Sequence, residues 1–241
     1  MLKFSDSRNF GRTLTGLLLF TAPAVLLIST AISPDTDHKD KVQELNAVAA
    51  HKGSYLFSNV LFLVGGLLII AMGIGIMRLF RGNGGVTAGQ VSGALLVLGG
   101  TVTMAWYSLG IMEYEMATDK GLDRQALATF LHKANDAGGL VPIFILFLIG
   151  VVIGTILLAI ANWRTRVAPI WASVAIVLGG VVGAFSDGKA IGIVSFVLLL
   201  AGLGALGARV LSMSDEEWDQ PRMRYRSGSG APAAPEPAPA G

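Results

Sequence analysis

Apolar residues gather in six long intervals that contain no Asp, Glu, Lys, Arg or His. These intervals cover residues 13–34, 53–77, 82–112, 137–163, 167–186 and 190–208. A helix of about 20 apolar residues crosses a bilayer core about 30 Å thick. Inside that core every backbone N–H and C=O must be bonded within the protein, which a helix achieves by itself. The pattern therefore predicts transmembrane helices at about 13–34, 55–77, 87–112, 139–162, 168–186 and 190–208.

The expected fold class is all-α, a polytopic membrane bundle of six transmembrane helices within residues 13–210. None of the intervals shows the alternation of polar and apolar residues that is typical of a membrane β-barrel. Residues 1–12 form a polar amino-terminal segment, and residues 211–241 are rich in Pro, Ala, Gly and Ser. Such a composition buries too little apolar surface to order itself, so a disordered tail is expected.

The first two connections on one side of the membrane are predicted to be short amphipathic helices. One apolar face comprises Val42, Leu45, Val48 and Ala49, with Thr36 as a candidate cap. The other comprises Leu122, Ala126, Leu127, Phe130 and Leu131, and this helix is expected to begin near Asp119. We expect both stripes to lie on the outer rim of the bundle or in the headgroup layer. A lid over a vestibule is the alternative.

Short sequence matches recur at intervals of about 80 residues. Val97-Leu98-Gly99-Gly100 returns as Val177-Leu178-Gly179-Gly180, and His51-Lys52 returns as His132-Lys133. An arginine pair follows each even-numbered span. The matches predict three helical hairpins in the same orientation, the third closed by the turn Asp187-Gly188-Lys189.

The chain has 14% charged residues, against about 25% in soluble domains, and no Cys. These values exclude a soluble globular enzyme, a nucleic-acid-binding module, disulfides and thiolate metal sites. The arginines at 78, 81, 164 and 166 lie on one side of the predicted membrane without acids beside them. Because Lys and Arg accumulate on the cytoplasmic side, both termini are predicted to be cytoplasmic, in the cell (plasma) membrane. A cleavable signal ending near Ser29-Thr30-Ala31 is the rival interpretation of the first interval, and would leave five spans.

Polar side chains within the predicted spans are uncharged. Ser58, Asn59, Thr101 and Thr103 are the candidates for a polar lining, although hydrogen bonds between helices explain them equally well. Ion-coupled carriers and proton relays normally place an ionisable residue at membrane depth, and these spans contain none. Trp106 and Tyr107 lie where they could line an outward pocket or anchor the helix at the interface.

The outer connections offer one candidate metal site. His51 and His132 hold equivalent repeat positions, and Glu113 and Asp187 end neighbouring spans on that side. Imidazole and carboxylate groups suit zinc. The adjacent Lys52 and Lys133 would repel a cation, so the sequence favours a solvated polar rim and no cofactor. The motifs Gly150-x-x-x-Gly154 and Gly179-x-x-x-Gly183 predict close helix packing, within one chain or between two copies.

Three segments of the sequence resemble segments of known proteins. They are Glu113-Tyr-Glu-Met-Ala117, Gly154-Thr-Ile-Leu-Leu-Ala-Ile-Ala-Asn-Trp-Arg-Thr-Arg166 and Ala168-Pro-Ile-Trp171. With the span pattern, they resemble the uncharacterised multi-pass membrane proteins of high-GC Gram-positive bacteria. The resemblance implies a membrane bundle without an assigned activity.

The sequence favours a non-enzymatic accessory, scaffold or sensor-like component of the cell envelope. Its expected partners are membrane lipids, another membrane protein or a second copy, and no nucleic acid. The rival hypothesis is a transporter or channel for a small molecule or lipid. A cavity lined by Ser58, Asn59, Thr101 or Thr103 would favour the rival. An outer-face metal-binding protein is the third hypothesis.

Overall fold

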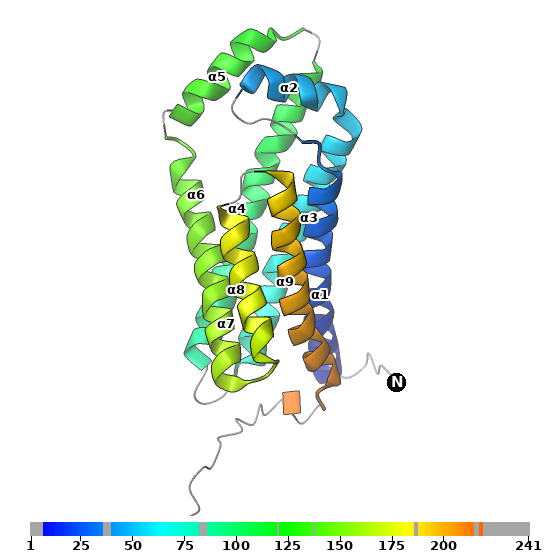
Figure 1. The fold of residues 1–241 in the computed structure, drawn as a ribbon, viewed down its shortest axis with the longest axis vertical. Coiled ribbons are helices and arrows are strands. Elements are labelled where there is room, and N and C mark those ends of the chain that lie inside the picture. The colour runs from blue at the N-terminus through cyan, green and yellow to red at the C-terminus, as the bar shows by residue number, and fades with distance from the viewer. Residues whose placement is uncertain are drawn as a thin grey trace, which may run out of the picture.

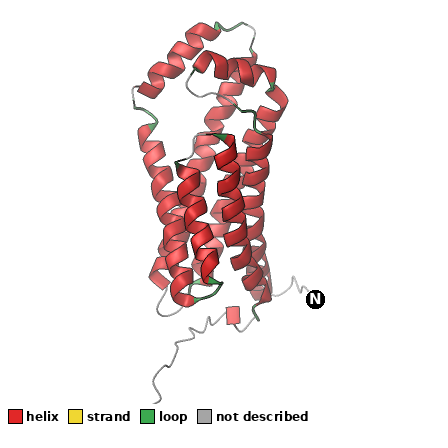
Figure 2. Cartoon of the chain, in the orientation of Figure 1, coloured by secondary structure: helices red, strands yellow, loops and turns green. Residues whose placement is uncertain are grey.

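Every regular element among the described residues is helical (Figures 1 and 2). The computed structural model describes residues 7–35, 40–81, 86–119, 121–136, 138–185, 188–214 and 217–218. The elements are α1 (Ser7–Ile32), α2 (Lys41–Ala50), α3 (Lys52–Leu79), α4 (Val86–Thr118), α5 (Arg124–Asp136), α6 (Val141–Phe147), the π-helical segment η1 (Leu148–Ile153), α7 (Gly154–Thr165), α8 (Ile170–Ala184) and α9 (Lys189–Ser212).

Five helical stretches are long and apolar enough to cross a membrane. They are Asn9–Ile32, Lys52–Leu79, Thr87–Thr118, Val141–Thr165 and Lys189–Ser212. The fourth joins α6, η1 and α7 into one continuous rod. The predicted fifth span, 168–186, is the shorter helix α8, which has 15 residues. At 1.5 Å per residue it is about 22 Å long, less than the thickness of a bilayer core.

The long helices and α8 form a closed ring. α1 packs against α3 and α9, α3 packs against α4, α4 packs against η1 and α7, and α8 packs between α7 and α9. Helices α2 and α5 lie across one end of the ring, here called the capped end (Figure 1). Ser7 and Ser212 lie at the opposite end, here called the tail end, where Arg12 Nη1 donates to the carbonyl of Met213.

Glycines let neighbouring helices of the ring touch backbone to backbone. A β-carbon at Gly73 would lie 2.6 Å from the carbonyl oxygen of Gly93, and one at Gly100 would lie 2.7 Å from that of Gly66. A β-carbon at Gly150 would lie 2.5 Å from the Cα of Gly99. Small residues are what permit such approach where the hydrophobic effect does not drive helices together. The contacts of Gly150 are therefore made within this one chain.

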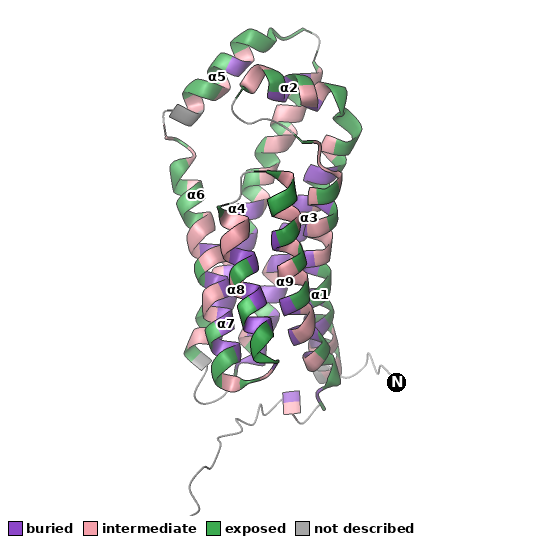
Figure 3. Cartoon of the chain, in the orientation of Figure 1, coloured by how far each residue is buried: buried purple, intermediate pink, exposed green. Residues whose placement is uncertain are grey.

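The interior of the ring is closely packed at its tail end. Ile76, Leu158, Ile176 and Leu206 are fully buried there, and Figure 3 shows buried residues on the faces that the helices turn toward one another. Large apolar side chains also cover the outside, as Phe20, Leu67 and Leu178 illustrate with exposed fractions of 54%, 57% and 48%. Soluble monomers seldom expose apolar surface so widely, so this exterior fits a lipid environment.

Helices α2 and α5 cover the capped end by packing on each other and on α4. Leu45 and Val48 of α2 are fully buried against Ala117 and Ala128, in a cluster separate from the main core. The stripe predicted for α2 is thus buried within the protein rather than in the headgroup layer. On α5, Phe130 stays 62% exposed. Helix α4 runs on to Thr118, beyond the predicted end at residue 112, because its last turns support this cap.

Two aspartates set the starts of the cap helices. Asp40 Oδ1 accepts hydrogen bonds from the backbone N–H groups of Val42 and Gln43, at 2.9 and 3.2 Å. The sequence candidate Thr36 lies outside the described residues. In α5, Asp123 Oδ1 accepts from Gln125 N, whereas Asp119 Oδ1 accepts from Gly121 N in the preceding turn. The helix therefore begins at Arg124, later than predicted.

Candidate ligand cavity

The capped half of the ring is hollow. A cavity of about 1240 Å³ lies along the ring axis and is lined from every helix of the ring and from both cap helices. Its floor is apolar and is formed by Ile69, Met72, Leu96, Leu199 and Leu203. Small residues line one side of the cavity. Gly179, Gly180, Gly183 and Ala184 of α8, with Gly188 and Gly192 before and within α9, line this side of the cavity.

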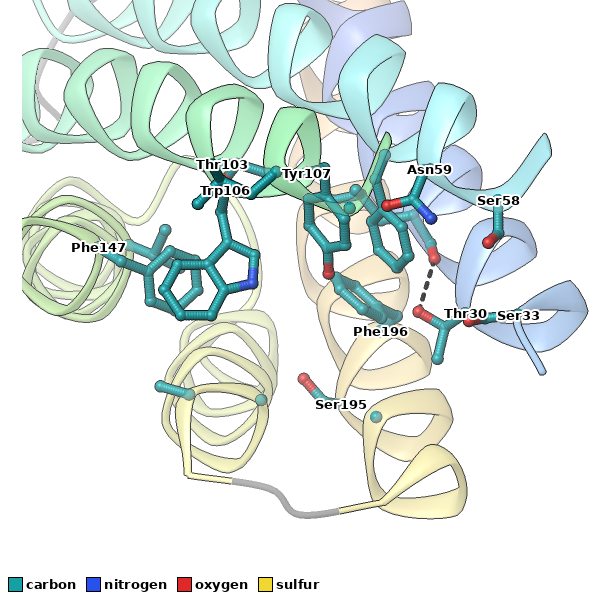
Figure 4. A pocket seen from close by; sticks show the side chains of 18 of the residues that line it. Thr30, Ser33, Ser58, Asn59, Thr103, Trp106, Tyr107, Phe147, Ser195 and Phe196 are labelled. Atoms are coloured by element: carbon teal, nitrogen blue, oxygen red, sulfur yellow. Dashed lines mark hydrogen bonds between the residues drawn. The ribbon is translucent and has the colours of Figure 1, made fainter. Parts of the chain in front are cut away.

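Aromatic side chains from four helices, α3, α4, α6 and α9, form the middle of the cavity. The rings of Phe62 and Tyr107 are stacked, with centroids 3.8 Å apart and an interplanar angle of 6°. Figure 4 shows Trp106 beside Phe147 and Tyr107 near Phe196. Such aromatic walls are common in pockets that hold an apolar molecule.

Four of the hydroxyl and amide side chains that line the cavity are already bonded to backbone carbonyls. Asn59 Nδ2 donates to Tyr55 O at 2.9 Å, and Thr103 Oγ1 donates to Gly99 O at 2.8 Å. Thr30 Oγ1 donates to Leu26 O at 2.9 Å (Figure 4). Ser195 Oγ donates to Gly179 O at 2.6 Å. The walls thus present mainly apolar surface to a ligand.

Two aromatic side chains in the cavity have a hydrogen-bond donor that a ligand could use. Trp106 Nε1 and Tyr107 Oη make no hydrogen bond to any residue in the described part of the chain. Trp106 is 40% exposed, and its indole N–H points into the cavity in Figure 4. An indole N–H and a phenol hydroxyl that line the cavity suit a ligand that carries a hydrogen-bond acceptor among apolar atoms.

The mouth of the cavity is polar. Tyr55 Oη donates to Glu113 Oε2 at 2.8 Å, and Lys41 is paired with Glu44 under the cap. Lys189 Nζ donates to the carbonyl of Ser33 at 2.8 Å, which ties the start of α9 to the end of α1. The cavity is therefore polar at its mouth and apolar at its floor. This arrangement is complementary to an amphipathic molecule.

The cavity lining extends to the ends of α8 and α9 that face the cap. The α8–α9 hairpin ends below the cap because α8 is short (Figure 1). Here the lining includes Gly139, Leu140 and Ala184 together with the exposed Gly188.

The segment η1, which follows α6 and forms part of the cavity wall, is a π-helix. Phe147 ends α6 and Val151 lies in η1, and both line the cavity. Gly150, between them, packs on Gly99 of α4. Single π-helical turns inside α-helices are found most often at functional sites, because the extra residue re-aims neighbouring side chains.

The cavity brings together three of the four polar residues predicted from the sequence. Ser58, Asn59 and Thr103 line it. Thr101 does not, because it is exposed and donates to Val97 O on another face of α4. Gly110 makes room for Asn59, since a β-carbon there would lie 2.3 Å from the amide oxygen.

The four candidate metal ligands occupy different surroundings. His51 is exposed at the junction of α2 and α3, and His132 is exposed on α5. Glu113 accepts the hydrogen bond from Tyr55 in the cavity mouth. Asp187 lies outside the described residues. Within the described residues no group of three or more His, Asp and Glu side chains is placed to hold a metal ion.

Sequence reasoning did not single out Thr30, Phe62, Phe147, Ser195 or Phe196 as cavity residues. They are ordinary residues of apolar spans, and their inward direction depends on how each helix is rotated. The small residues of α8 give no such signal either, because Gly179, Gly180 and Gly183 pack closely against side chains of α7 and α9.

Comparison with known proteins gives no relative. The chain matches no protein-family model, and no curated protein or solved structure is significantly similar to it.

Proposed function

We propose that this chain is an integral protein of the cell (plasma) membrane that binds an amphipathic, lipid-like molecule in its central cavity. The observation that carries the proposal is the cavity of about 1240 Å³, with a polar mouth and an apolar floor. Pockets for drug-sized molecules measure about 300–1,000 Å³, so this space suits a larger ligand such as a lipid.

We further propose that α8 crosses the membrane with the five longer helices, so that both termini are cytoplasmic. Its position between α7 and α9 supports this placement, since α9 and the rod that contains α7 are both long and apolar enough to span. A helix somewhat too short for the bilayer is accommodated by local thinning at modest cost. The capped end then faces outward, opposite the arginines of the tail end.

The threefold hairpin repeat stays a proposal, and equivalent glycines support it. Gly100 packs on Gly66 of the preceding helix α3, and Gly180 packs on Thr155 of the preceding helix α7. Gly99 packs on Gly150 of the following rod, and Gly179 packs on Leu199 of the following helix α9. Residues matched by the repeat therefore have matching neighbours.

The proposed role is non-enzymatic lipid binding, as in an accessory or sensor-like envelope protein. The solid packing of Ile76, Ile176 and Leu206 at the tail end supports a receptor or sensor, because a molecule in the cavity meets a closed floor. A transporter is the second candidate, favoured by the lining of Ser58, Asn59 and Thr103. Transport would require the tail end to open.

Native mass spectrometry of protein purified in mild detergent tests the proposal. The expected result is one tightly held amphipathic molecule per chain, which survives exchange into a second detergent. Release of the complex by excess short-chain detergent would provide the molecule for identification. Spectra that contain only protein and readily exchanged detergent, under conditions that preserve the fold, would contradict lipid binding in the cavity.

A further inference from the structure

A second groove lies on the outside of the ring, between α7 and α8. Its volume is about 420 Å³, and it is lined by Ile156, Ala159, Ile160, Trp163, Arg164, Ser173, Val174, Val177 and Leu178. None of these residues lines the central cavity. Ile160, Val174 and Leu178 are 38%, 48% and 48% exposed, so the groove faces away from the ring axis.

Hydrogen bonds at the tail end fix the width of this groove. Asn162 is buried and donates from Nδ2 to Ser173 Oγ at 2.8 Å, while its Oδ1 accepts from Ala168 N at 2.8 Å. These bonds join the end of α7 to the start of α8 and leave Ser173 satisfied. The groove therefore has a fixed tail end, and most of its lining residues are apolar.

One cation lies in the groove. Arg164 is exposed in the last turn of α7 and makes no ion pair or hydrogen bond with the residues that the structure describes. Trp163, 55% exposed, lies next to it in the sequence and also lines the groove. Arginine binds phosphate oxygens with two parallel hydrogen bonds, and tryptophan favours the headgroup level of a bilayer.

We propose that this groove binds one anionic phospholipid, with the phosphate on Arg164 and an acyl chain along the apolar stripe toward Ile156. From Ile156 to Trp163 the helix rises about 10 Å, which fits within one leaflet of a core about 30 Å thick. Charge complementarity selects a phospholipid with net negative charge. The proposal rests on the membrane placement proposed above, and it is independent of what the central cavity binds.

Delipidated protein titrated with dioleoyl phosphatidylglycerol, and separately with dioleoyl phosphatidylcholine, tests this site by native mass spectrometry. We expect Arg164→Gln to weaken binding of the first phosphatidylglycerol about fivefold, with a smaller effect on phosphatidylcholine. Arg81→Gln is the matched control, because Arg81 is an exposed arginine near the same end of the bundle that lines neither cavity nor groove. This control should bind like the unmodified protein.

A second variant keeps the test decisive. Ile160→Trp fills the groove without changing charge, and it should weaken binding of both lipids. An equal effect of Arg164→Gln and Arg81→Gln would overturn the proposal, since it would indicate diffuse charge attraction. Unchanged binding in Arg164→Gln, or displacement of the lipid by inorganic phosphate alone, would also overturn it. Loss of the central ligand with normal phosphatidylglycerol binding would affect only the cavity proposal.

Discussion

Gly150→Ala is expected to destabilise the folded bundle by about 2–3 kcal/mol, because one added methyl group has no space. The new β-carbon would lie 2.5 Å from both the Cα and the backbone nitrogen of Gly99. Backbone atoms cannot move aside as a flexible side chain can. Helix α4 and segment η1 would have to separate, and the wall of the cavity beside Phe147 and Val151 would shift with them.

Gly53→Ala is the matched control for this variant. Gly53 is also helical, yet a β-carbon there would meet nothing within 4 Å. Alanine in a helix is favoured over glycine by up to about 1 kcal/mol, so this variant should be neutral or slightly more stable. Unfolding in a titration with sodium dodecyl sulfate, followed by circular dichroism, measures both. Equal stability of the two variants would contradict the close contact between α4 and η1.

Thr30→Phe is expected to reduce the amount of bound amphipathic molecule at least tenfold, or about 1.4 kcal/mol in binding free energy. Thr30 lines the cavity, and Figure 4 shows its side chain at the cavity wall. A phenyl ring at this position would occupy space that the ligand needs.

Ile28→Phe provides the comparison on the same helix. Ile28 is 53% exposed and does not line the cavity, so a larger apolar side chain there faces outward. Native mass spectrometry of the two purified variants gives the ligand occupancy directly. Thr30→Phe should remain as thermally stable as the Ile28 variant. Full occupancy in Thr30→Phe would mean that the molecule binds elsewhere.

The charge-free intervals predicted the long helices well, because the cost of placing an ionised group in hydrocarbon acts on each residue alone. The predicted span 55–77 lies within α3 (Lys52–Leu79). The interval 167–186 was a weaker guide, since it also contains the turn before α8. There Pro169 precedes the helix, and the chain is fixed by Asn162, a contact between residues that hydropathy does not register.

Which polar residues face the cavity could be predicted only in part. Ser58, Asn59 and Thr103 stood out as polar groups in apolar spans, as did Thr101. Thr101 and Thr103 are two residues apart, which is about 200° around a helix, so they cannot both face the same cavity. The helix rotation that selects Thr103 is set by Gly93 and Gly100 against α3. That pairing depends on tertiary packing.

The position of the cap could not be predicted from its apolar stripes. An apolar stripe such as Leu45 and Val48 can be buried either in a headgroup layer or against other helices, here at Ala117 and Ala128. The sequence pattern alone does not distinguish these two locations. The end of α4 decides between them, because its extension to Thr118 brings Ala117 under α2. The lid over a vestibule, the alternative interpretation of the sequence, agrees with this arrangement.

Cysteine accessibility tests most directly the claim that the hollow end of a membrane-spanning ring faces outward. The chain has no Cys, so single substitutions give an unambiguous signal. Ala184→Cys lies at the cavity mouth and Arg81→Cys near the tail end. In intact cells, a membrane-impermeant maleimide should label Ala184→Cys and should label Arg81→Cys only after permeabilisation. Labelling of both positions before permeabilisation, or the reverse pattern, would contradict the account.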